Sequence, residues 1–194
     1  ELNGKDVTNL AAYQRARRGL GRTFQSAELF PELTVRETVL VALEARQRTG
    51  FLSTALYMPH AMRRDRRKRQ EAAELIDFLG LGRYVDTFVN ELSTGTRRIV
   101  ELAGLIAINQ PVLCLDEPTA GVAQREAEAF GPLIQRIKQD LDATVVVIEH
   151  DMPLIMSISD RIYCMEAGTV IAEGDPETVR ADPLVIASYL GTDE

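Results

Sequence analysis

Hydrophobic positions divide the chain into a helical first half and a second half in which short apolar runs predominate. From residue 32 to about residue 81, apolar side chains recur at intervals of three and four residues, which is helical spacing. Gly and Pro interrupt this pattern at residues 50–53 and 58–60. No strand pattern occurs here, so we expect a helical subdomain with two apolar stripes, formed by Val35, Val39, Leu40 and Leu43 and by Leu75, Ile76 and Leu79.

The second half predicts a parallel strand–helix–strand unit. Residues 112–115 and 144–148 are continuous apolar runs of the kind found in parallel sheets covered on both faces. Parallel strands need a long crossover connection, and residues 126–141 between the two runs predict one amphipathic helix. The apolar face of this helix is formed by Phe130, Leu133, Ile134, Ile137 and Leu141.

Further elements flank this unit. A helix with a broad apolar surface is expected directly after Leu92-Ser93-Thr94-Gly95. Residues 161–165 and 169–172 predict a hairpin around Ala167-Gly168, and short helices are expected at residues 176–181 and 183–190. At the other end of the chain, Asn3-Gly4 predicts a tight turn that suits the end of an antiparallel sheet.

Composition narrows the classes of function. With 194 residues, of which 45% are hydrophobic, the chain is long enough for one core with a subdomain. No apolar run approaches the roughly 20 residues that cross a bilayer. The formal net charge of -7 argues against a general nucleic-acid binder, because such proteins need a positive surface to displace counterions.

Some polar and sulfur-containing residues are assigned ordinary structural roles. The basic run at residues 63–69 is interpreted as a solvated helix start, with contact to anionic lipid headgroups or an acidic partner as the alternative. Cys114 and Cys164 lie in apolar runs, where a thiol is usually a small buried hydrophobe. His60 follows Met58-Pro59 and is interpreted as a loop histidine.

Two adjacent carboxylates carry the main chemical signal. Asp116 and Glu117 follow an apolar strand, where the first can hold the water shell of Mg²⁺ and the second can polarise an attacking water. The chain is therefore an ATPase candidate. A phosphate loop of the form GxxxxGK followed by Ser or Thr is missing: Gly4-Lys5 precedes Asp6, and residues 19–23 lack the lysine. Because the chain also begins with Glu1, we expect a piece of a longer protein.

Four motifs in register resemble an ABC-transporter ATP-binding subunit: Gln25, residues 92–96, residues 115–121 and Glu149-His150-Asp151. Residues 28–35, the insertion containing residues 50–53 and the ending at residues 182–191 resemble the branched-chain amino acid importer group, to which urea and amide importers are similar. The resemblance implies an α/β fold, a partial P-loop NTPase (ABC ATPase) core with a parallel sheet plus a helical subdomain. Residues 1–31 then carry the core through the Q-loop, residues 32–92 the helical subdomain, and residues 93–194 the signature helix, Walker B strand, H-loop and C-terminal elements.

The same resemblance implies roles around MgATP. Gln25 is placed to reach Mg²⁺ and the attacking water and to couple nucleotide state to a permease. Asp116 orients Mg²⁺ through water, and Glu117 accepts the proton of the attacking water. His150 contacts the γ-phosphate and helps to position Glu117.

A signature loop is implied at the start of the helix near residue 93. Ser93, Thr94, Gly95 and Thr96 are expected to contact the γ-phosphate of ATP on a second ATPase subunit, with Ser93 also capping the helix. The sequence departs from the family at Thr94 and Thr96, where Gly and Gln are usual. It also has Ala123 where the family commonly has an aspartate that crosses the dimer.

The resemblance therefore implies an ATP-hydrolysing subunit of an ABC importer, bound peripherally at the cytoplasmic face of the inner membrane. Its expected partners are a second ABC ATPase subunit and transmembrane permease subunits, with no nucleic acid. ATP and Mg²⁺ are the expected cofactors, and the chain as given is expected to be inactive without a phosphate loop. The alternatives are a non-catalytic ABC-like interaction module and a soluble ABC ATPase acting on nucleic acid or ribosomes.

Overall fold

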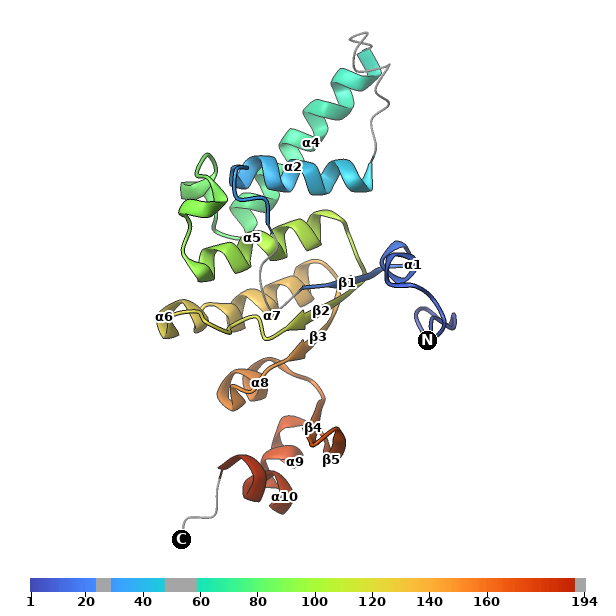
Figure 1. Cartoon of the computed structure of the whole chain (residues 1–194), viewed down its shortest axis with the longest axis vertical. Coiled ribbons are helices and arrows are strands. Elements are labelled where there is room, and N and C mark those ends of the chain that lie inside the picture. The colour runs from blue at the N-terminus through green and yellow to red at the C-terminus, as the bar shows by residue number, and fades with distance from the viewer. Residues whose placement is uncertain (24–28, 48–58, 191–194) are drawn as a thin grey trace. The chain divides into compact units, whose positions relative to one another are not determined.

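A computed structural model describes residues 1–23, 29–47 and 59–190 (Figure 1). The chain divides into two compact units, Glu1–Ile148 and Glu149–Glu194, which are described separately below. Gln25 and the insertion at residues 50–53 lie outside the described residues.

A three-stranded parallel sheet forms the centre of the first unit, in the order β1 (Leu20–Arg22), β2 (Val112–Asp116) and β3 (Thr144–Ile148). Its middle strand, β2, buries Leu113 and Leu115 almost completely. The strand–helix–strand prediction is confirmed. Residues 20–22 are strand, so the segment that lacks the phosphate-loop lysine is part of the sheet.

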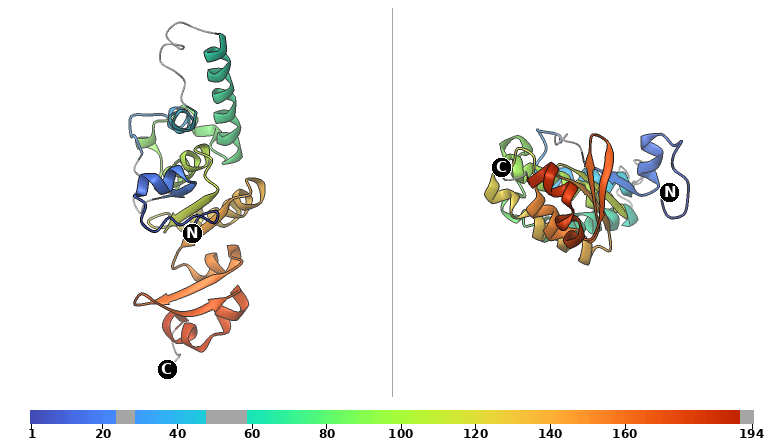
Figure 2. Two further views of the ribbon diagram at one scale, coloured as in Figure 1. Left: turned by 90° about the vertical axis from the view of Figure 1, so that its right-hand side faces the viewer. Right: turned by 90° about the horizontal axis from the view of Figure 1, so that it is seen from below.

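The helical part of the first unit includes α2 (Val35–Arg46), α4 (Pro59–Phe78) and α5 (Thr94–Ala107). Helix α2 packs against both α4 and α5, as Figure 1 and the left view in Figure 2 allow the reader to follow. Short 3-10 turns, η1 (Gly82–Tyr84) and η2 (Val89–Glu91), connect α4 to α5. The predicted stripes are largely buried, with contributions from Val35, Val39, Leu43, Ile76 and Leu79.

The predicted break at residues 58–60 is wrong for Pro59 and His60, which begin α4, and Met58 lies outside the described residues. Pro59 is the first residue of α4, and His60 is its second and is exposed. Proline suits the first helical turn because its missing N–H has no intrahelical partner there and its φ is already helical. The interpretation of His60 as a loop histidine is therefore wrong.

The basic run at residues 63–69 lies inside α4 and is not a helix start. Most of its side chains are exposed, but Lys68 is only 4% exposed and forms an ion pair with Glu44 of α2. Arg46 of α2 pairs in turn with Glu71 of α4. These two ion pairs join α2 to α4, so part of the run stabilises helix packing instead of facing solvent.

The single helix predicted for residues 126–141 is two helices, α6 (Gln124–Ala127) and α7 (Phe130–Asp140). Pro132 explains the break, because it cannot donate a hydrogen bond to the carbonyl of Glu128 and its ring crowds that carbonyl. The predicted apolar face is buried in α7 except at Leu141, which is 41% exposed. The guanidinium of Arg136 in α7 lies 4.6 Å from the ring centre of Phe78, at the end of α4.

Within the first unit, one face of β3 is left without cover, contrary to the expectation from its apolar run. Exposed and half-buried residues alternate along it, and Val146 and Ile148 are 48% and 57% exposed. Helix α7 contacts β3, and this alternation is the pattern of a strand with one face covered. Hydrophobicity along a strand does not by itself report how many layers pack against it.

The N-terminal turn and α1 (Ala12–Arg17) precede the sheet. Leu2 and Lys5 form a bridge across Asn3 and Gly4, whose φ angles of 50° and 72° are those of a tight hairpin turn. The predicted turn is confirmed. The guanidinium of Arg15 in α1 donates hydrogen bonds to the carbonyls of Val7 and Thr8 at 3.0 and 2.7 Å, respectively.

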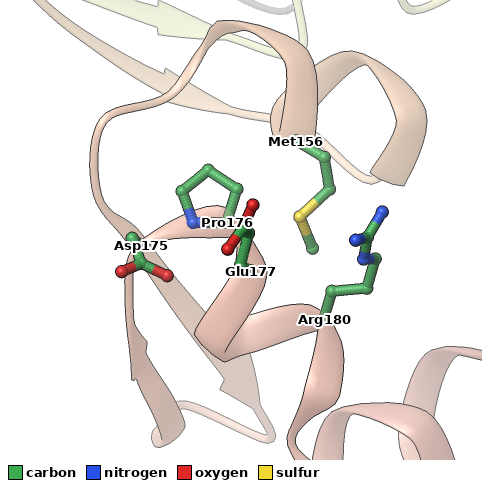
Figure 3. A pocket seen from close by; sticks show the side chains of 5 residues that line it. All are labelled: Met156, Asp175, Pro176, Glu177 and Arg180. Atoms are coloured by element: carbon green, nitrogen blue, oxygen red, sulfur yellow. The ribbon is translucent and has the colours of Figure 1, made fainter.

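The second unit contains α8 (Met152–Ile158), the antiparallel strands β4 (Ile162–Glu166) and β5 (Thr169–Gly174), α9 (Pro176–Ala181) and α10 (Pro183–Val185). A π-helical turn, Ile186–Leu190, follows α10. The predicted hairpin and the predicted helix at residues 176–181 are confirmed, and α8 was not predicted. A pocket of about 460 Å³ lies between α8 and α9, lined by Met156, Asp175, Pro176, Glu177 and Arg180 (Figure 3).

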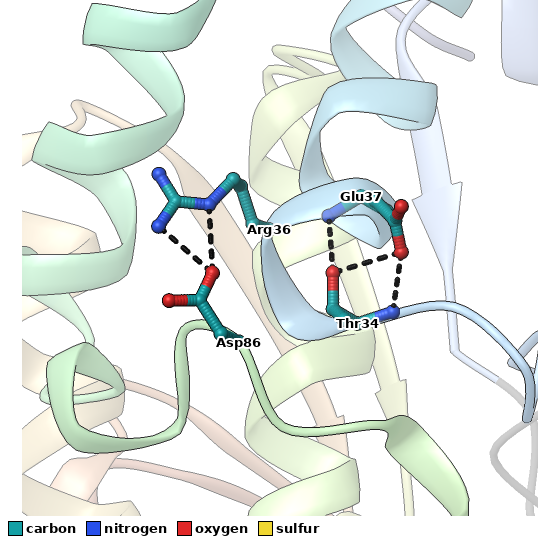
Figure 4. A network of polar contacts seen from close by, with 4 residues as sticks. All are labelled: Thr34, Arg36, Glu37 and Asp86. Atoms are coloured by element: carbon teal, nitrogen blue, oxygen red, sulfur yellow. Dashed lines mark hydrogen bonds and ion pairs between the residues drawn. The ribbon is translucent and has the colours of Figure 1, made fainter.

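A capping box fixes the start of α2 (Figure 4). The hydroxyl of Thr34 accepts a hydrogen bond from the N–H of Glu37 at 3.2 Å, and the Glu37 carboxylate accepts one from the N–H of Thr34 at 2.9 Å. The backbone N–H and hydroxyl of Thr34 hold the pKa of the Glu37 carboxyl below its ordinary value. Beside this box, Arg36 donates to Asp86 from Nε and Nη2 at 3.1 and 2.9 Å (Figure 4).

We expect Glu37→Ala to destabilise the chain at pH 7 and to lose this effect in acid. The pKa of Glu37 is lowered by folding, so its contribution is complete above its ordinary pKa and disappears as pH falls through the folded value. Urea unfolding at several pH values measures the effect. Glu32→Ala is the matched control, because Glu32 is an exposed carboxylate just before α2. A pH-independent difference between the two variants would contradict the prediction.

Candidate functional site

The carboxyl end of β2 presents the two acidic residues singled out from the sequence. The side chain of Asp116 is 19% exposed and accepts a hydrogen bond on Oδ2 from Nη2 of Arg22 at 2.8 Å. The backbone N–H of Asp116 donates to Oγ1 of Thr23 at 3.1 Å. Since β1 and β2 are parallel, their carboxyl ends lie side by side, and two residues at the end of β1 thereby hold Asp116.

Glu117 has a backbone conformation that is unusual for a non-glycine residue. Its φ of 46° lies in the left-handed region, which costs about 1 kcal/mol or more for a residue with a Cβ. Its N–H donates to the carbonyl of Ile148 at 2.8 Å, and its own carbonyl accepts from the N–H of Ala120 at 3.0 Å. Such strain persists where the surroundings enforce it, most often at functional sites, and here it turns the chain directly after Asp116.

The start of α5 confirms the predicted cap at Ser93. Oγ of Ser93 accepts a hydrogen bond from the N–H of Thr96 at 3.2 Å and lies 2.9 Å from Oγ1 of Thr96. The same hydroxyl donates to Oε1 of Glu126 in α6 at 2.9 Å. A carboxylate of the chain itself therefore lies at the positive end of a 14-residue helix, where the helix dipole stabilises negative charge.

A side chain at position 95 would push the Glu126 carboxylate aside, because Glu126 and Val122 occupy the space beside Gly95. A Cβ on Gly95 would lie 2.5 Å from Oε2 of Glu126 and 3.0 Å from Cγ1 of Val122. Thr94, the first residue of α5, is exposed, whereas Thr96 is 7% exposed. Ala123 is an exposed N-cap of α6 and has no side chain that could accept a capping hydrogen bond.

His150 belongs to the second unit and its side chain is 76% exposed. Its Nδ1 lies 3.7 Å from Oε2 of Glu149, which also accepts the backbone N–H of His150 at 3.1 Å. The next residue, Asp151, caps α8 through the N–H of Leu154 at 3.0 Å. His150 therefore follows β3 in the sequence and is followed by the start of α8.

The single carboxylate of Asp116 fits a metal ion whose other ligands come from outside the protein. Within the described ranges, no group of three or more His, Cys, Asp or Glu side chains is arranged to hold a metal ion. Mg²⁺ is usually held by one or two carboxylates together with waters and substrate phosphates. Asp116 therefore suits a Mg²⁺ that arrives with a phosphate ligand, and it does not form an all-protein metal site.

The cysteines take no part in this arrangement. Cys164 is buried and Cys114 is half-buried, and neither forms a disulfide. Burial raises the pKa of both thiols, which keeps them protonated at neutral pH. The interpretation of these cysteines as small hydrophobes is confirmed for Cys164 and holds in part for Cys114.

Sequence reasoning missed three residues of the site: Arg22, Thr23 and Glu126. Arg22 and Thr23 lie 94 and 93 residues before Asp116, and only strand pairing brings them to it. Glu126 lies 33 residues after Ser93 and reaches it from α6. The one local signal was the position of Arg22 and Thr23 just before Gln25, at the end of the basic stretch that begins at Arg15.

Comparisons with known proteins identify the family of this chain. Residues 1–120 match the family described as ABC transporter, and residues 169–194 match the one described as branched-chain amino acid ATP-binding cassette transporter. The high-affinity branched-chain amino acid transport ATP-binding protein BraF of Pseudomonas aeruginosa is 36% identical over 98% of this chain and 74% of that protein. LivG of Escherichia coli, with the same description, is 37% identical over the same shares. The lipopolysaccharide export system ATP-binding protein LptB of Haemophilus influenzae is 31% identical over 98% of this chain and 73% of its own.

Solved structures show the same fold. The ADP conformation of MJ1267, an ATP-binding cassette of an ABC transporter, has a TM-score of 0.74 and 29% identity over 97% of this chain and 74% of that one. A nucleotide-free ATP-binding cassette from an ABC transporter has a TM-score of 0.72 and 27% identity, over 97% of this chain and 75% of that one. The predicted α/β fold with a parallel sheet is confirmed. The chain therefore belongs to the family of ABC transporter ATP-binding subunits, with the branched-chain amino acid transport proteins among its relatives.

Proposed function

We propose that this chain belongs to the ATP-hydrolysing, energy-coupling subunit of a branched-chain amino acid importer and carries its Walker B, signature and H-loop motifs. The observation that carries the proposal is the end of β2, where Asp116 is followed by Glu117 in a left-handed backbone conformation. The printed functions of BraF and LivG, and the match of residues 169–194, favour branched-chain amino acids as the solute class. LptB, whose system exports lipopolysaccharide, is less similar.

In this proposal each part of the site has one task. Asp116 holds Mg²⁺ through water, and Glu117 accepts the proton of the water that attacks the γ-phosphate. When bound, Mg²⁺ neutralises negative charge on the phosphates. The proposal also gives Gln25 a role at the metal and the attacking water, and His150 a role at the γ-phosphate.

The start of α5 is proposed to contact ATP held by a second ATPase subunit. Ser93, Thr94, Gly95 and Thr96 surround the first turn, whose N–H groups and dipole attract anions. The Ser93 hydroxyl donates to Glu126, so this carboxylate must give way before a phosphate oxygen can accept from Ser93. Ala123 provides no carboxylate to cross such a dimer, and we infer weaker communication between its two ATP sites.

We infer that the subunit works with transmembrane permease subunits at the cytoplasmic face of the inner membrane. None of the helices in the part of the chain that the structure describes is both long and apolar enough to cross a membrane. We also infer three functional segments: residues 1–31 through the Q-loop, the helical residues 32–92, and residues 93–194 with the signature, Walker B and H-loop motifs.

The chain as given is expected to bind MgATP very weakly and to hydrolyse none. Most phosphate affinity in a P-loop site comes from the lysine and backbone N–H groups of the phosphate loop, and this sequence has no such loop. Asp116 and Glu117 would then face the phosphates without enough compensating positive charge. Isothermal calorimetry with MgATP measures this directly, and a longer form of the protein that carries a phosphate loop is the matched comparison.

Micromolar binding by the chain as given would contradict this expectation, and residues 19–23 would be the first place to search for a phosphate site. Absence of MgATP hydrolysis by the longer form, assembled with its permease, would contradict the proposed function itself. The two outcomes are separate, because the first concerns the missing loop and the second concerns the residues described above.

A further inference from the structure

The pairing of Arg22 with Asp116 places a positive charge on the residue that is proposed to hold the metal. Nη2 of Arg22 lies 2.8 Å from Oδ2 of Asp116, which is direct, charge-assisted hydrogen-bond distance. A divalent cation at this carboxylate would meet the guanidinium within a few ångströms, and like charges at that range repel strongly. The ion pair and the metal therefore compete for the same carboxylate.

The contact is not needed to join the two strands. The N–H of Thr23 donates to the carbonyl of Cys114 at 2.9 Å, and the N–H of Asp116 donates to Oγ1 of Thr23 at 3.1 Å. These bonds continue the β1–β2 pairing to the end of β2 without the Arg22 side chain. Arg22 is 61% exposed in its side chain, so its guanidinium is able to leave Asp116 for water while the backbone around Asp116 stays in place.

We propose that Arg22 is an exchangeable counter-charge that neutralises Asp116 when no cation is bound and releases it when a divalent cation binds. This inference rests on the proposed function, because it takes Asp116 as the metal-holding residue. Arg22 is thus a positioning residue. It keeps the carboxylate oriented toward the end of β1 and lowers the affinity of the site for a metal that arrives without nucleotide.

The chain offers a matched control for this ion pair. Arg36 pairs with Asp86 through Nη2 at 2.9 Å, with side-chain exposures of 46% and 75%, at the start of α2 (Figure 4). Arg36→Met removes the same charge as Arg22→Met and also frees one aspartate. Any general effect of net charge on cation binding is therefore equal in the two variants.

The test uses Mn²⁺ alone and the ¹⁵N-labelled chain. Paramagnetic broadening of the amide signals of Asp116 and Glu117 reports cation binding at this carboxylate. We expect the Mn²⁺ concentration that broadens these amide signals by half to fall about threefold or more in Arg22→Met. Loss of a partly exposed ion pair that competes with the cation can change binding by about this factor. Arg22→Lys should remain near wild type because it keeps the charge, and Arg36→Met should not change binding at Asp116.

Equal or weaker Mn²⁺ binding at Asp116 in Arg22→Met than in Arg36→Met would overturn the proposal, and so would absence of binding at Asp116 in every variant. If Arg22→Met fails to fold, as judged by its amide spectrum, Arg22→Gln takes its place with the same expected result. These outcomes do not depend on ATP hydrolysis. Failure of this inference is therefore distinguishable from failure of the proposed function.

Discussion

Replacing Glu117 with glutamine in the form of the protein that carries a phosphate loop is expected to lower ATP turnover by roughly 100-fold or more, the range of a lost general base. Glutamine keeps the shape of the side chain but cannot accept the proton of the attacking water. The backbone turn at residue 117 is held by hydrogen bonds of its own N–H and carbonyl, so the substitution leaves that turn in place. ATP binding should be unchanged.

Turnover is measured as phosphate release at saturating MgATP, and binding by calorimetry. Glu128→Gln is the matched control, because it removes an exposed carboxylate between α6 and α7 and should have no effect. Near-normal turnover in Glu117→Gln would remove Glu117 from the catalytic role. Loss of both binding and turnover would instead indicate that the residue supports the structure of the site.

Damage to the signature loop of one subunit is expected to stop hydrolysis at the phosphate loop of the other. In a dimer with Ser93→Ala in one subunit only, we expect turnover at the opposite site to fall about tenfold to 100-fold, the effect of losing one hydrogen bond to a charged group. Trapping labelled nucleotide in subunits of different size identifies the site that fails.

Loss of helix capping accompanies this substitution and needs its own control. Ser93 caps α5, and removing a cap costs about 1 kcal/mol of stability. Thr34→Ala removes the cap of α2 at a comparable cost and leaves the signature loop intact, so it should preserve trapping at both sites. Failure at the mutated subunit's own site would contradict contact with ATP across the dimer.

Local sequence patterns predicted correctly the features that depend on residues adjacent in the sequence. The cap at Ser93, the turns at Asn3-Gly4 and Ala167-Gly168 and the helix at Pro176–Ala181 were predicted because capping and hairpin turns depend on a few adjacent residues. Proline was the main source of local error. Pro59 was taken as a break where it begins α4. Pro132 was overlooked in the first turn of α7, where it prevents residues 126–141 from forming one continuous helix.

The burial of side chains and the pairing of residues that are distant in the sequence were harder to predict from the sequence. The apolar run of β3 predicted cover on both faces, yet alternate residues are exposed, because cover depends on which elements pack on a strand. Lys68 looked like part of a solvated basic run and is almost fully buried, because Glu44 on a neighbouring helix offers an ion pair.

The sequence by itself determined the family, the parallel strand–helix–strand unit and the chemical groups of the candidate site, because motif order and hydrophobic period are written along the chain. Only the tertiary structure showed how those groups are engaged: Arg22 on Asp116, Glu126 on Ser93, and Glu117 in a left-handed turn. The physical reason is that contacting side chains lie far apart in the sequence. The two side-chain contacts join residues 94 and 33 positions apart, and no local pattern records partners that meet only when strands and helices pack together.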